Sequence, residues 1–496
     1  MRSLRPFLLL LLVIVVIVPS PRAKQAQLPA TPTAENPAVR RAQEIIKYVN
    51  TSTRAEYRKY VQEQYSPTFL RGPIDRHLDF FSLLQDTTHG VEFHGVQDAK
   101  PAEALVRLRN KLTGEWVNLL VRTEATEPYR IAGLGLRPGQ PPAEMKPKKL
   151  TPEQMTQELD ALMTKVAQAD VFSGAVLLAK DGQVIYKKAA GMANKDFNVP
   201  NRIDTKFNLG SMNKMFTSVS IAQLVERGKL SFDDPLSKFL PDFPDKESAQ
   251  KIKIKHLLTH TAGLGSYFNQ KFDESSRARF RTVNDMMELA KDEKLQFEPG
   301  SRWQYSNTGM LVLGAVIEKV TGQSYFDYVR ENIYKVAGMT NSDCYELDRV
   351  NTNLAVGYEK EYTDNGIQFR NNIFMHVMRG GPAGGGYSTV EDLLKFATAL
   401  RAHKLVGESY VKLLLSAKPE LNSPRYGFGF SIDSDNQVVG HSGGFPGISS
   451  NLDMFLRSGY TAIVMSNYGN GATPFRIKMQ EIVLATQETQ AAKGSS

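Results

Sequence analysis

The chain has 496 residues, of which 41% are hydrophobic and 23% charged, with 37 glycines and 25 prolines. This is the composition of a soluble globular protein of two or three domains, and it excludes collagen-like, coiled-coil and largely disordered chains. The net charge of +9 is spread along the chain without interleaved basic and aromatic runs, so we predict no nucleic-acid partner. The single cysteine, Cys344, excludes an internal disulfide and a zinc site built from several thiolates.

Residues 1–30 have the pattern of an export signal. Arg2 and Arg5 precede an apolar run from Phe7 to Val18, which is too short to span a bilayer core of about 30 Å. We therefore expect an exported protein, either periplasmic or extracellular. The small-residue cleavage pattern around Ala23 is poor, which leaves an uncleaved anchor as the alternative and as the only expected route to a membrane.

Residues 31–136 predict a small accessory α+β domain. Apolar residues first recur at helical spacing and then alternate with polar ones, as in Ala104, Val106 and Leu108. This order of helices before an antiparallel sheet resembles the cone-shaped domains related to nuclear transport factor 2 (NTF2-like). The resemblance rests on layout and implies no chemistry. A proline-rich, basic linker is expected over residues 137–150.

Residues 151–488 predict a second α+β domain, with a flexible tail over residues 489–496. A helix over 152–167 and a hairpin that turns at Asp181-Gly182 open this domain. Further antiparallel strands and a closing helix are predicted at its far end, over residues 426–432, 437–441, 449–456, 460–467 and 475–485. The predicted architecture is an antiparallel sheet built from both ends of the domain, with a helical middle from Met212 to about Leu415.

Two patterns that are typical of catalytic or metal sites are rejected because of the residues around them. Gly-x-Ser-x-Gly occurs around Ser442, but it leads into a strand, and His441 is the last histidine of the chain, so a lipase-type nucleophile elbow is rejected. His256 and His260 have metal-site spacing, but no Glu follows His256 and Gly263 indicates a helix end. We interpret them as packed, hydrogen-bonded histidines, and we predict neither a metal nor a cofactor.

A serine activated by a lysine one helical turn away is the remaining route to a nucleophile. Ser-x-x-Lys occurs at Ser211, Ser248 and Ser409, but only Ser211 is expected to open a core helix; Ser248 is expected in a polar loop and Ser409 inside an apolar segment. There Lys214 faces the same way, helix N–H groups favour a developing alkoxide, and desolvation reduces the proton affinity of the lysine. An N-cap serine beside a solvated lysine is the alternative.

Two more motifs follow Ser211-Met-Asn-Lys214 in order, namely Tyr305-Ser-Asn307 and His441-Ser-Gly443. Together they resemble the three signatures of the penicillin-recognising serine hydrolases, closest to class C β-lactamases and the enzymes of peptidase family S12. The resemblance covers about residues 150–484 and leaves the N-terminal domain outside. Four longer stretches are also similar to the family, over residues 254–264, 297–317, 384–392 and 426–430.

The resemblance implies a β-lactamase/transpeptidase-like fold and an acyl-enzyme mechanism on a small peptide, amide or ester. Ser211 is the implied nucleophile, and Lys214 and Tyr305 share the proton transfers. The implied substrate-binding residues are Asn307, His441, Ser442 and Gly443. The implied oxyanion hole consists of the backbone N–H groups of Ser211 and Gly444.

His441 stands where β-lactamases and many carboxypeptidases have a lysine, which weakens the case for β-lactams as the natural substrate. An imidazole ordinarily has a pKa of about 6.5, so we expect a limb between about pH 5 and 8 in the pH profile for anionic substrates. We also expect His441→Lys to favour substrates that bear a carboxylate. A catalytically silent sensor or binding module on the same fold is the rival hypothesis, but all four of Ser211, Lys214, Tyr305 and Asn307 are present, which favours a hydrolase.

Overall fold

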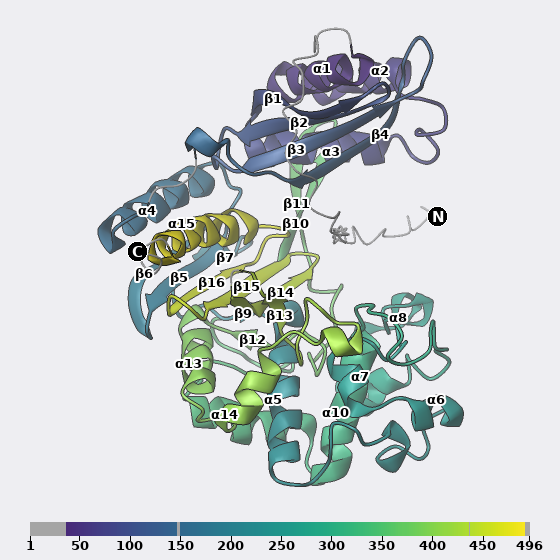
Figure 1. The fold of residues 1–496 in the computed structure, drawn as a ribbon, viewed down its shortest axis with the longest axis vertical. Helices are drawn as coiled ribbons and strands as arrows, with labels where there is room; N and C mark the ends of the chain where they lie inside the picture. Colours follow the sequence, from purple (N-terminus) through teal and green to yellow (C-terminus); the bar gives the residue numbers. More distant parts are fainter. Residues whose placement is uncertain (1–35, 146–148, 436, 492–496) are drawn as a thin grey trace. The chain divides into compact units, whose positions relative to one another are not determined.

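The computed structural model describes residues 36–145, 149–435 and 437–491, with side chains as far as Thr486. The chain divides into two compact units, Met1–Lys146 and Pro147–Ser496 (Figure 1). The predicted export signal and most of the predicted tail lie outside the described residues. Within the described ranges, no helix combines the length and the apolar character that a membrane crossing requires.

The N-terminal unit is a four-stranded antiparallel sheet with three helices. Its elements are α1 (Pro37–Thr51), α2 (Arg54–Gln64), α3 (Asp75–Thr88), β1 (Val91–Lys100), β2 (Glu103–Asn110), β3 (Trp116–Thr123) and β4 (Ile131–Pro138). The strands pair in chain order, α1 packs on β1, β2 and β3, and Ala104, Val106 and Leu108 of β2 are buried in the core. The predicted α+β order is confirmed, whereas the likeness to nuclear transport factor 2 stays a prediction.

Two elements of this unit were not predicted. Helix α2 buries only Tyr57, Tyr60 and Val61, so its sequence lacks a continuous apolar stripe. Strand β1 has register shifts between Phe93 and Asp98, and these shifts break the alternation that marks a half-buried strand.

The C-terminal unit is built around a six-stranded antiparallel sheet. Its strands are β5 (Gly174–Lys180), β6 (Gln183–Ala190), β13 (Ser431–Asp433), β14 (Val438–Phe445), β15 (Ile448–Phe455) and β16 (Tyr460–Ser466). Their order in the sheet is β13-β14-β15-β16-β5-β6, so β16 pairs with β5 although most of the domain lies between them in sequence. This confirms the prediction of a sheet assembled from both ends of the domain.

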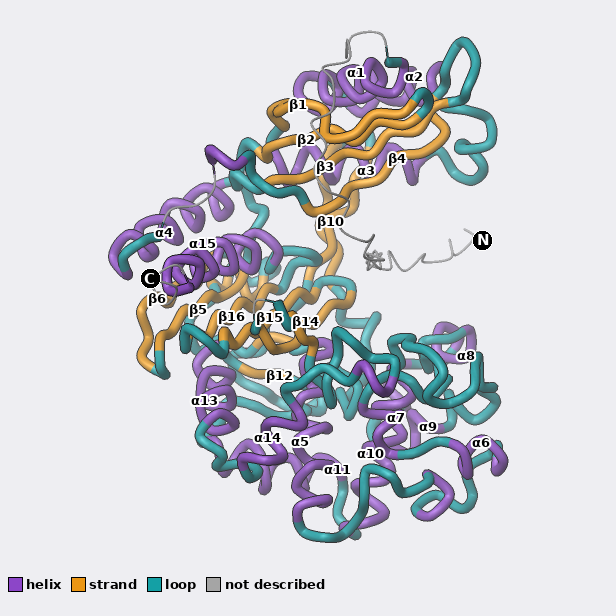
Figure 2. The backbone as a smooth tube through the Cα atoms, viewed as in Figure 1, coloured by secondary structure: helices purple, strands orange, loops and turns teal. Residues whose placement is uncertain are grey.

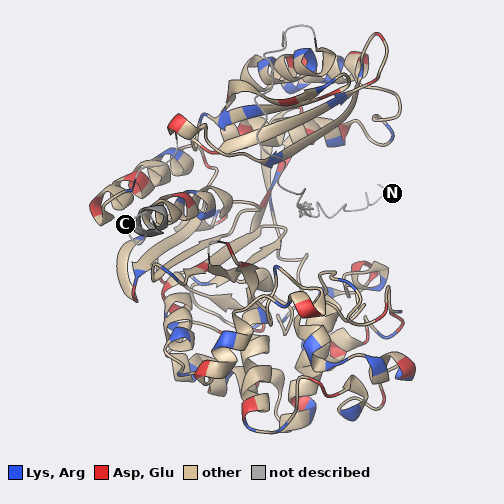
Figure 3. Ribbon diagram, in the orientation of Figure 1, with Lys and Arg blue, Asp and Glu red and all other residues tan. Residues whose placement is uncertain are grey.

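Helices cover both faces of this sheet (Figure 2). α4 (Pro152–Gln168) packs on β6 and α15 (Thr473–Ala491) packs on β15 and β16, while α13 (Val390–Arg401) packs on β5 and β16. Charges of both signs are interspersed over the outer helices (Figure 3). The helices between the two groups of strands are α5 (Asn213–Glu226), α6 (Lys246–Lys251), α7 (Ile254–Leu258), α8 (Gln270–Glu274), α9 (Val283–Met287), α10 (Asn307–Thr321), α11 (Tyr325–Val329), α12 (Lys335–Ala337) and α14 (Glu408–Leu414).

The middle of the domain also contains strands that were not predicted. In the hairpin of β10 (Tyr358–Thr363) and β11 (Gly366–Asn371), β10 is mostly half-buried and β11 is exposed. Both strands are polar, which hides their pattern. Four further short strands form two pairs, three of the strands lying before Met212 and one within the middle: β7 (Met192–Asn194), β8 (Val199–Pro200), β9 (Phe207–Asn208) and β12 (Tyr387–Ser388). β7 pairs with β8, and β9 pairs with β12.

The predicted strand over residues 426–432 is wrong. The chain makes a tight turn there, with the N–H of Gly427 donating to the carbonyl of Phe430 at 2.8 Å, and only Ser431–Asp433 forms a strand. Gly429 has φ of +80°, and a Cβ atom at this position would collide with the side chain of Ser218. The turn therefore depends on a glycine that the alternating pattern does not reveal.

Candidate active site

Ser211 lies in a 3₁₀ turn, η2 (Gly210–Met212), that leads directly into the buried helix α5. The pairing of β9 with β12 holds the chain just before this turn. Gly210 has φ of +50°, and a Cβ atom there would stand 2.9 Å from the backbone nitrogen of Gly444 on β14. Gly210 thus lets the nucleophile turn approach the edge of the sheet closely.

Lys214 is fully buried one turn after Ser211. Its Nζ lies 3.1 Å from the Oγ of Ser211, 2.9 Å from the Oδ1 of Asn307 and 2.5 Å from the carbonyl oxygen of Ala383. Burial lowers the pKa of Lys214 well below its ordinary value, which favours the neutral amine. A neutral amine has two hydrogens and one lone pair. Because the oxygens of Asn307 and Ala383 can only accept, both hydrogens go to them and the lone pair is left for the proton of Ser211.

Tyr305 lies next to this pair. The Nζ of Lys214 stands 4.8 Å from the centroid of the tyrosine ring. Burial raises the pKa of Tyr305, and a hydrogen bond with the side chain of Ser211 offsets this only in part. The phenol therefore keeps its proton at neutral pH, within reach of the serine oxygen.

Asn307 opens helix α10. The Nδ2 of Asn307 donates to the Oγ of Ser266 at 3.1 Å, and its Oδ1 faces Lys214. Ser306 caps the helix by accepting from the N–H of Gly309, and its own N–H donates to the Nδ1 of His260. These bonds join the loop that carries Tyr305 and Asn307 to the loop after α7.

His441 lies on β14 with both ring nitrogens in hydrogen bonds. Nδ1 is 2.6 Å from the carbonyl oxygen of Ser442, and Nε2 is 2.9 Å from the hydroxyl of Tyr426. Burial lowers the pKa of His441 to about 3. The expected pH limb between about pH 5 and 8 therefore does not follow from His441, because the imidazole stays neutral over that range.

The segment from His441 to Gly444 forms a strand edge beside the nucleophile. β13 pairs only with Val438, Val439 and Gly440, so within the described residues no strand pairs with the next part of β14 on that side. Ser442 and Gly444 are exposed along this edge. A Cβ atom on Gly443 would collide with the carbonyl oxygen of Leu209, which fixes a glycine at this position.

Comparisons with known proteins identify a family for most of the C-terminal unit. The family model described as Beta-lactamase matches residues 154–487, well over half of the chain. The chain belongs to the β-lactamase family. The N-terminal unit lies outside the match.

Three relatives of this β-lactamase-family protein differ in their chemistry. A penicillin-binding protein from Bacillus halodurans is 29% identical, with a TM-score of 0.59, over 67% of this chain and 99% of that chain. Esterase EstB of Burkholderia gladioli is 28% identical over 66% of this chain and 94% of the relative. A D-stereospecific amidohydrolase from Streptomyces sp. is 27% identical, with a TM-score of 0.52, over 64% of this chain and 95% of that chain.

The two histidines that were rejected as metal ligands on sequence have structural roles. The Nδ1 of His256 accepts from the N–H of Lys253 at the start of α7, and His260 is buried under the aromatic rings of the site. Among the described residues, no group of three or more His, Cys, Asp or Glu is placed to hold a metal ion.

Two placements of the other Ser-x-x-Lys serines were wrong. Ser248 lies in the short helix α6 rather than in a loop, and Ser409 lies in the first turn of α14 rather than in the middle of a segment. Ser409 is exposed, and its Lys412 pairs with Glu408 in solvent. Lys412 is engaged by Glu408 and is not buried against the serine as Lys214 is, so helical position alone does not make this site.

Several residues that shape the site carry no assigned role in the sequence. Ala383 contributes only a backbone carbonyl, which no side-chain motif marks. Ser266 and Tyr426 act on Asn307 and His441 through single hydrogen bonds. Tyr426 lies inside one of the family-like stretches, residues 426–430. Ser266 and Ala383 lie just outside two others, residues 254–264 and 384–392, so these stretches do not mark them.

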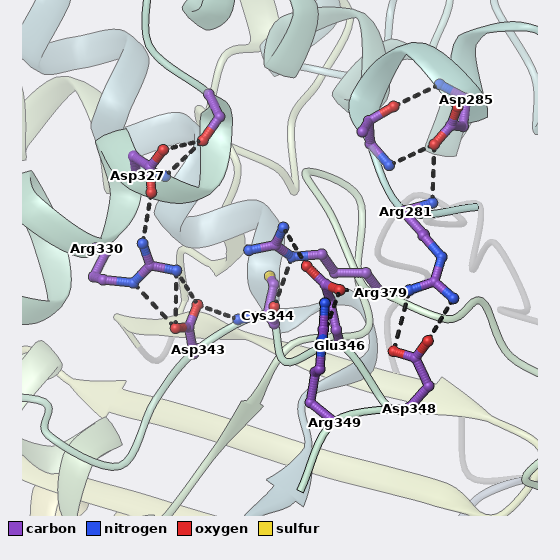
Figure 4. A network of polar contacts seen from close by, with 12 residues as sticks. Arg281, Asp285, Asp327, Arg330, Asp343, Cys344, Glu346, Asp348, Arg349 and Arg379 are labelled. Atoms are coloured by element: carbon purple, nitrogen blue, oxygen red, sulfur yellow. Dashed lines mark hydrogen bonds and ion pairs between the residues drawn. The ribbon is translucent and has the colours of Figure 1, made fainter. Parts of the chain in front are cut away.

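A polar network holds the segment before the glycine-rich loop of residues 380–386 (Figure 4). Arg379 donates to the carbonyl of Cys344 at 2.9 Å, pairs with Glu346 at 3.4 Å and lies 3.6 Å from the centroid of the Phe326 ring. The loop itself is tied to α5, because the N–H of Gly386 donates to the Oδ1 of Asn213. Arg379 and the separate bond between Gly386 and Asn213 thus hold the two ends of the loop that supplies the carbonyl of Ala383.

Proposed function

We propose that this protein is a serine hydrolase that forms an acyl-enzyme at Ser211 with a small peptide, amide or ester. The observation that carries the proposal is the hydrogen bonding of Lys214, whose two acceptor-only partners direct the amine lone pair toward the Ser211 hydroxyl. A buried lysine with this arrangement has the form and the position of a general base.

The reaction has two halves. The Oγ of Ser211 attacks the carbonyl carbon of the substrate as its proton passes to Lys214, and the resulting oxyanion accepts hydrogen bonds from the backbone N–H groups of Ser211 and Gly444. Collapse breaks the bond to the leaving amine or alcohol, which takes a proton through Tyr305. Water then attacks the acyl-enzyme, releases the acid and returns the proton to Ser211.

The substrate is held by the edge of β14 and by Asn307. An extended substrate would align along the edge of β14 from His441 to Gly443, which no described strand occupies on the β13 side, and the Ser442 hydroxyl is exposed beside it. Asn307 is polarised by Lys214 and stands where a substrate amide would pass. The esterase and amidohydrolase among the relatives support this range of substrates.

The experiment compares turnover of a panel of D-amino-acid amides, short-chain esters and a chromogenic cephalosporin by the wild type, Ser211→Ala and Ser409→Ala. We expect hydrolysis of at least one ester or amide, its loss in Ser211→Ala and its retention in Ser409→Ala. Acylation without any turnover would instead support a silent binding module. Turnover that survives in Ser211→Ala would contradict the proposed mechanism.

We also propose that the protein is exported and that residues 31–136 form an accessory domain. The support is the apolar run from Phe7 to Val18 after two arginines. N-terminal sequencing of protein recovered outside the cytoplasm should find a first residue between about Ala23 and Thr31. An intact Met1 on membrane-bound protein would favour the uncleaved anchor.

A further inference from the structure

Tyr305 lies in a segment without regular secondary structure. Residues 297–306 form neither a helix nor a strand, so no hydrogen-bond ladder holds the phenol in place. The loop after α7 is bonded to this segment, because the N–H of Gln304 donates to the carbonyl of His260 at 2.9 Å. The residue just before Tyr305 is therefore tied to His260.

His260 also contacts the residue after Tyr305 and the tyrosine ring itself. The N–H of Ser306 donates to the Nδ1 of His260 at 3.2 Å. A backbone N–H can only donate, so Nδ1 carries a lone pair and the imidazole is neutral. The centroid of the imidazole lies 4.4 Å from that of the Tyr305 ring. His260 thus holds Tyr305 through both of its chain neighbours and through one face of its ring.

The backbone of His260 is strained. Its φ is +60°, a region that few residues other than glycine adopt, and the residue is 1% exposed. Such strain persists where the surrounding contacts over-determine the conformation, and it is concentrated at functional sites. In this conformation the carbonyl of His260 accepts from Gln304 while its ring accepts from Ser306. The strained residue therefore makes both bonds to the segment that carries Tyr305.

We propose that His260 is a positioning residue for Tyr305, and that the bond from Ser306 to its Nδ1 keeps the phenol within reach of Ser211 and of the leaving group. The proposal rests on the hydrolase function proposed above and adds a residue on which protonation of the leaving group depends. His260 itself transfers no proton, because Nδ1 already accepts from Ser306 and Nε2 has no partner within the described residues. A misplacement of about 1 Å at a catalytic group can cost about 10²-fold in rate.

Three substitutions separate the Nδ1 bond from the backbone conformation and from packing. Glycine and asparagine both tolerate a φ of +60°. His260→Asn retains an acceptor, Oδ1, for the N–H of Ser306, whereas His260→Gly removes the acceptor together with the ring. His260→Phe fills the space of the ring without an acceptor, so the comparison stands even where the glycine variant does not fold.

Two esters with the same acyl group measure the position of Tyr305. p-Nitrophenyl butyrate loses a stabilised phenolate that needs no proton, whereas ethyl butyrate loses an alkoxide that must take one. We define the ester ratio as kcat/KM for the p-nitrophenyl ester divided by kcat/KM for the ethyl ester. A general loss of folded protein lowers both values equally and leaves this ratio unchanged. We expect His260→Gly and His260→Phe to raise the ester ratio by about 10-fold or more, and His260→Asn to keep it within about 3-fold of the wild type.

A double-mutant cycle tests whether His260 acts through Tyr305. Tyr305→Phe should raise the ester ratio by itself, and adding His260→Gly or His260→Phe to that variant should raise it no further. His256→Ala removes another buried imidazole that accepts from a backbone N–H, that of Lys253, and should keep the wild-type ratio. A wild-type ratio in the glycine or phenylalanine variant, or an equal further rise in the Tyr305→Phe background, would overturn the proposal. An asparagine variant as impaired as the other two would contradict the role of the Nδ1 bond.

Crystal structures of the His260 variants give a measure that does not depend on turnover. In His260→Gly or His260→Phe we expect the Tyr305 hydroxyl to move by about 1 Å or more relative to the Oγ of Ser211, the scale at which misplacement affects catalysis. An unmoved hydroxyl would overturn the positioning role. A wild type that hydrolyses neither ester, or a Tyr305→Phe variant with the wild-type ratio, would count against the proposed function, and the position of the hydroxyl would still decide the role of His260.

Discussion

The Nζ of Lys214 lies 3.1 Å from the Oγ of Ser211, and the two other partners of this amine are oxygens that can only accept a hydrogen bond. The distance alone is that of an ordinary hydrogen bond. The neutral amine donates its two hydrogens to the carbonyl of Ala383 and the side chain of Asn307. The hydrogen bond between Ser211 and Lys214 is therefore donated by the serine hydroxyl. The loops that supply these two oxygens therefore determine the chemistry of the serine.

Lys214→Met should abolish turnover and change the pH dependence of stability. The pKa of Lys214 is lowered in the folded protein, so the unfolded state binds more protons at neutral pH and the lysine costs stability there. This cost shrinks as the pH rises toward the ordinary lysine value of about 10.4. In urea unfolding, the free energy of unfolding of the variant minus that of the wild type should thus be higher at pH 7 than at pH 10. A difference independent of pH would contradict the neutral amine.

Tyr305→Phe should lower the acylation rate by about 10² to 10⁴, the usual contribution of a positioned acid or base. The ring and its contact with Lys214 remain in this variant, so folding should be unchanged. Single-turnover kinetics with an active ester measure the rate, and circular dichroism checks the fold. Near-normal acylation would remove Tyr305 from the proton transfers.

The stability of the protein should fall as the pH drops below about 6.5. Burial lowers the pKa of His441 to about 3 and that of His256 to about 4, so the unfolded chain takes up these protons first. Each histidine adds up to about 1.4 kcal/mol per pH unit to the slope until its folded pKa is reached. Urea unfolding between pH 7 and 4.5 measures this slope. His441→Gln should reduce this slope.

Arg379→Ala should destabilise the C-terminal unit by about 1 to 3 kcal/mol and lower turnover by loosening the loop that carries Ala383. Arg379 is mostly buried, with its side chain 18% exposed, and it donates to the carbonyl of Cys344. Arg349 pairs with the same Glu346 but is 77% exposed, so Arg349→Ala should change stability by about 0.5 kcal/mol or less. Equal effects of the two changes would show that the network does not hold the loop.

The alternation and helical periodicity of the sequence were enough to predict the α+β class and the sheet built from both ends of the domain. Strands such as β5 and β16 are continuous apolar runs between clear turns, so their pattern survives without knowledge of their partners. Polar or irregular elements, such as α2, β1 and the hairpin β10–β11, were missed because exposure or a register shift removes the pattern.

The motifs identified the residues of the site but not the protonation states or hydrogen-bond directions of their side chains. Burial lowers the pKa of His441, and its hydrogen bond with Tyr426 comes from residues 426–430, which form a turn and not the strand that their pattern indicated. The direction of the Lys214 amine depends on the carbonyl of Ala383, a backbone atom without a sequence signal. Both features are contacts between segments that are distant along the chain or shaped by glycine.

Covalent labelling with a fluorophosphonate, followed by peptide mass spectrometry, tests the central claim most directly. Trypsin cleavage after Lys206 and Lys214 releases residues 207–214, which contain Ser211 as their single serine. We predict that the mass of this peptide increases by one adduct, and that the label is lost in Ser211→Ala and kept in Ser409→Ala. An adduct on the peptide that contains Ser442, with residues 207–214 unmodified, would contradict the account.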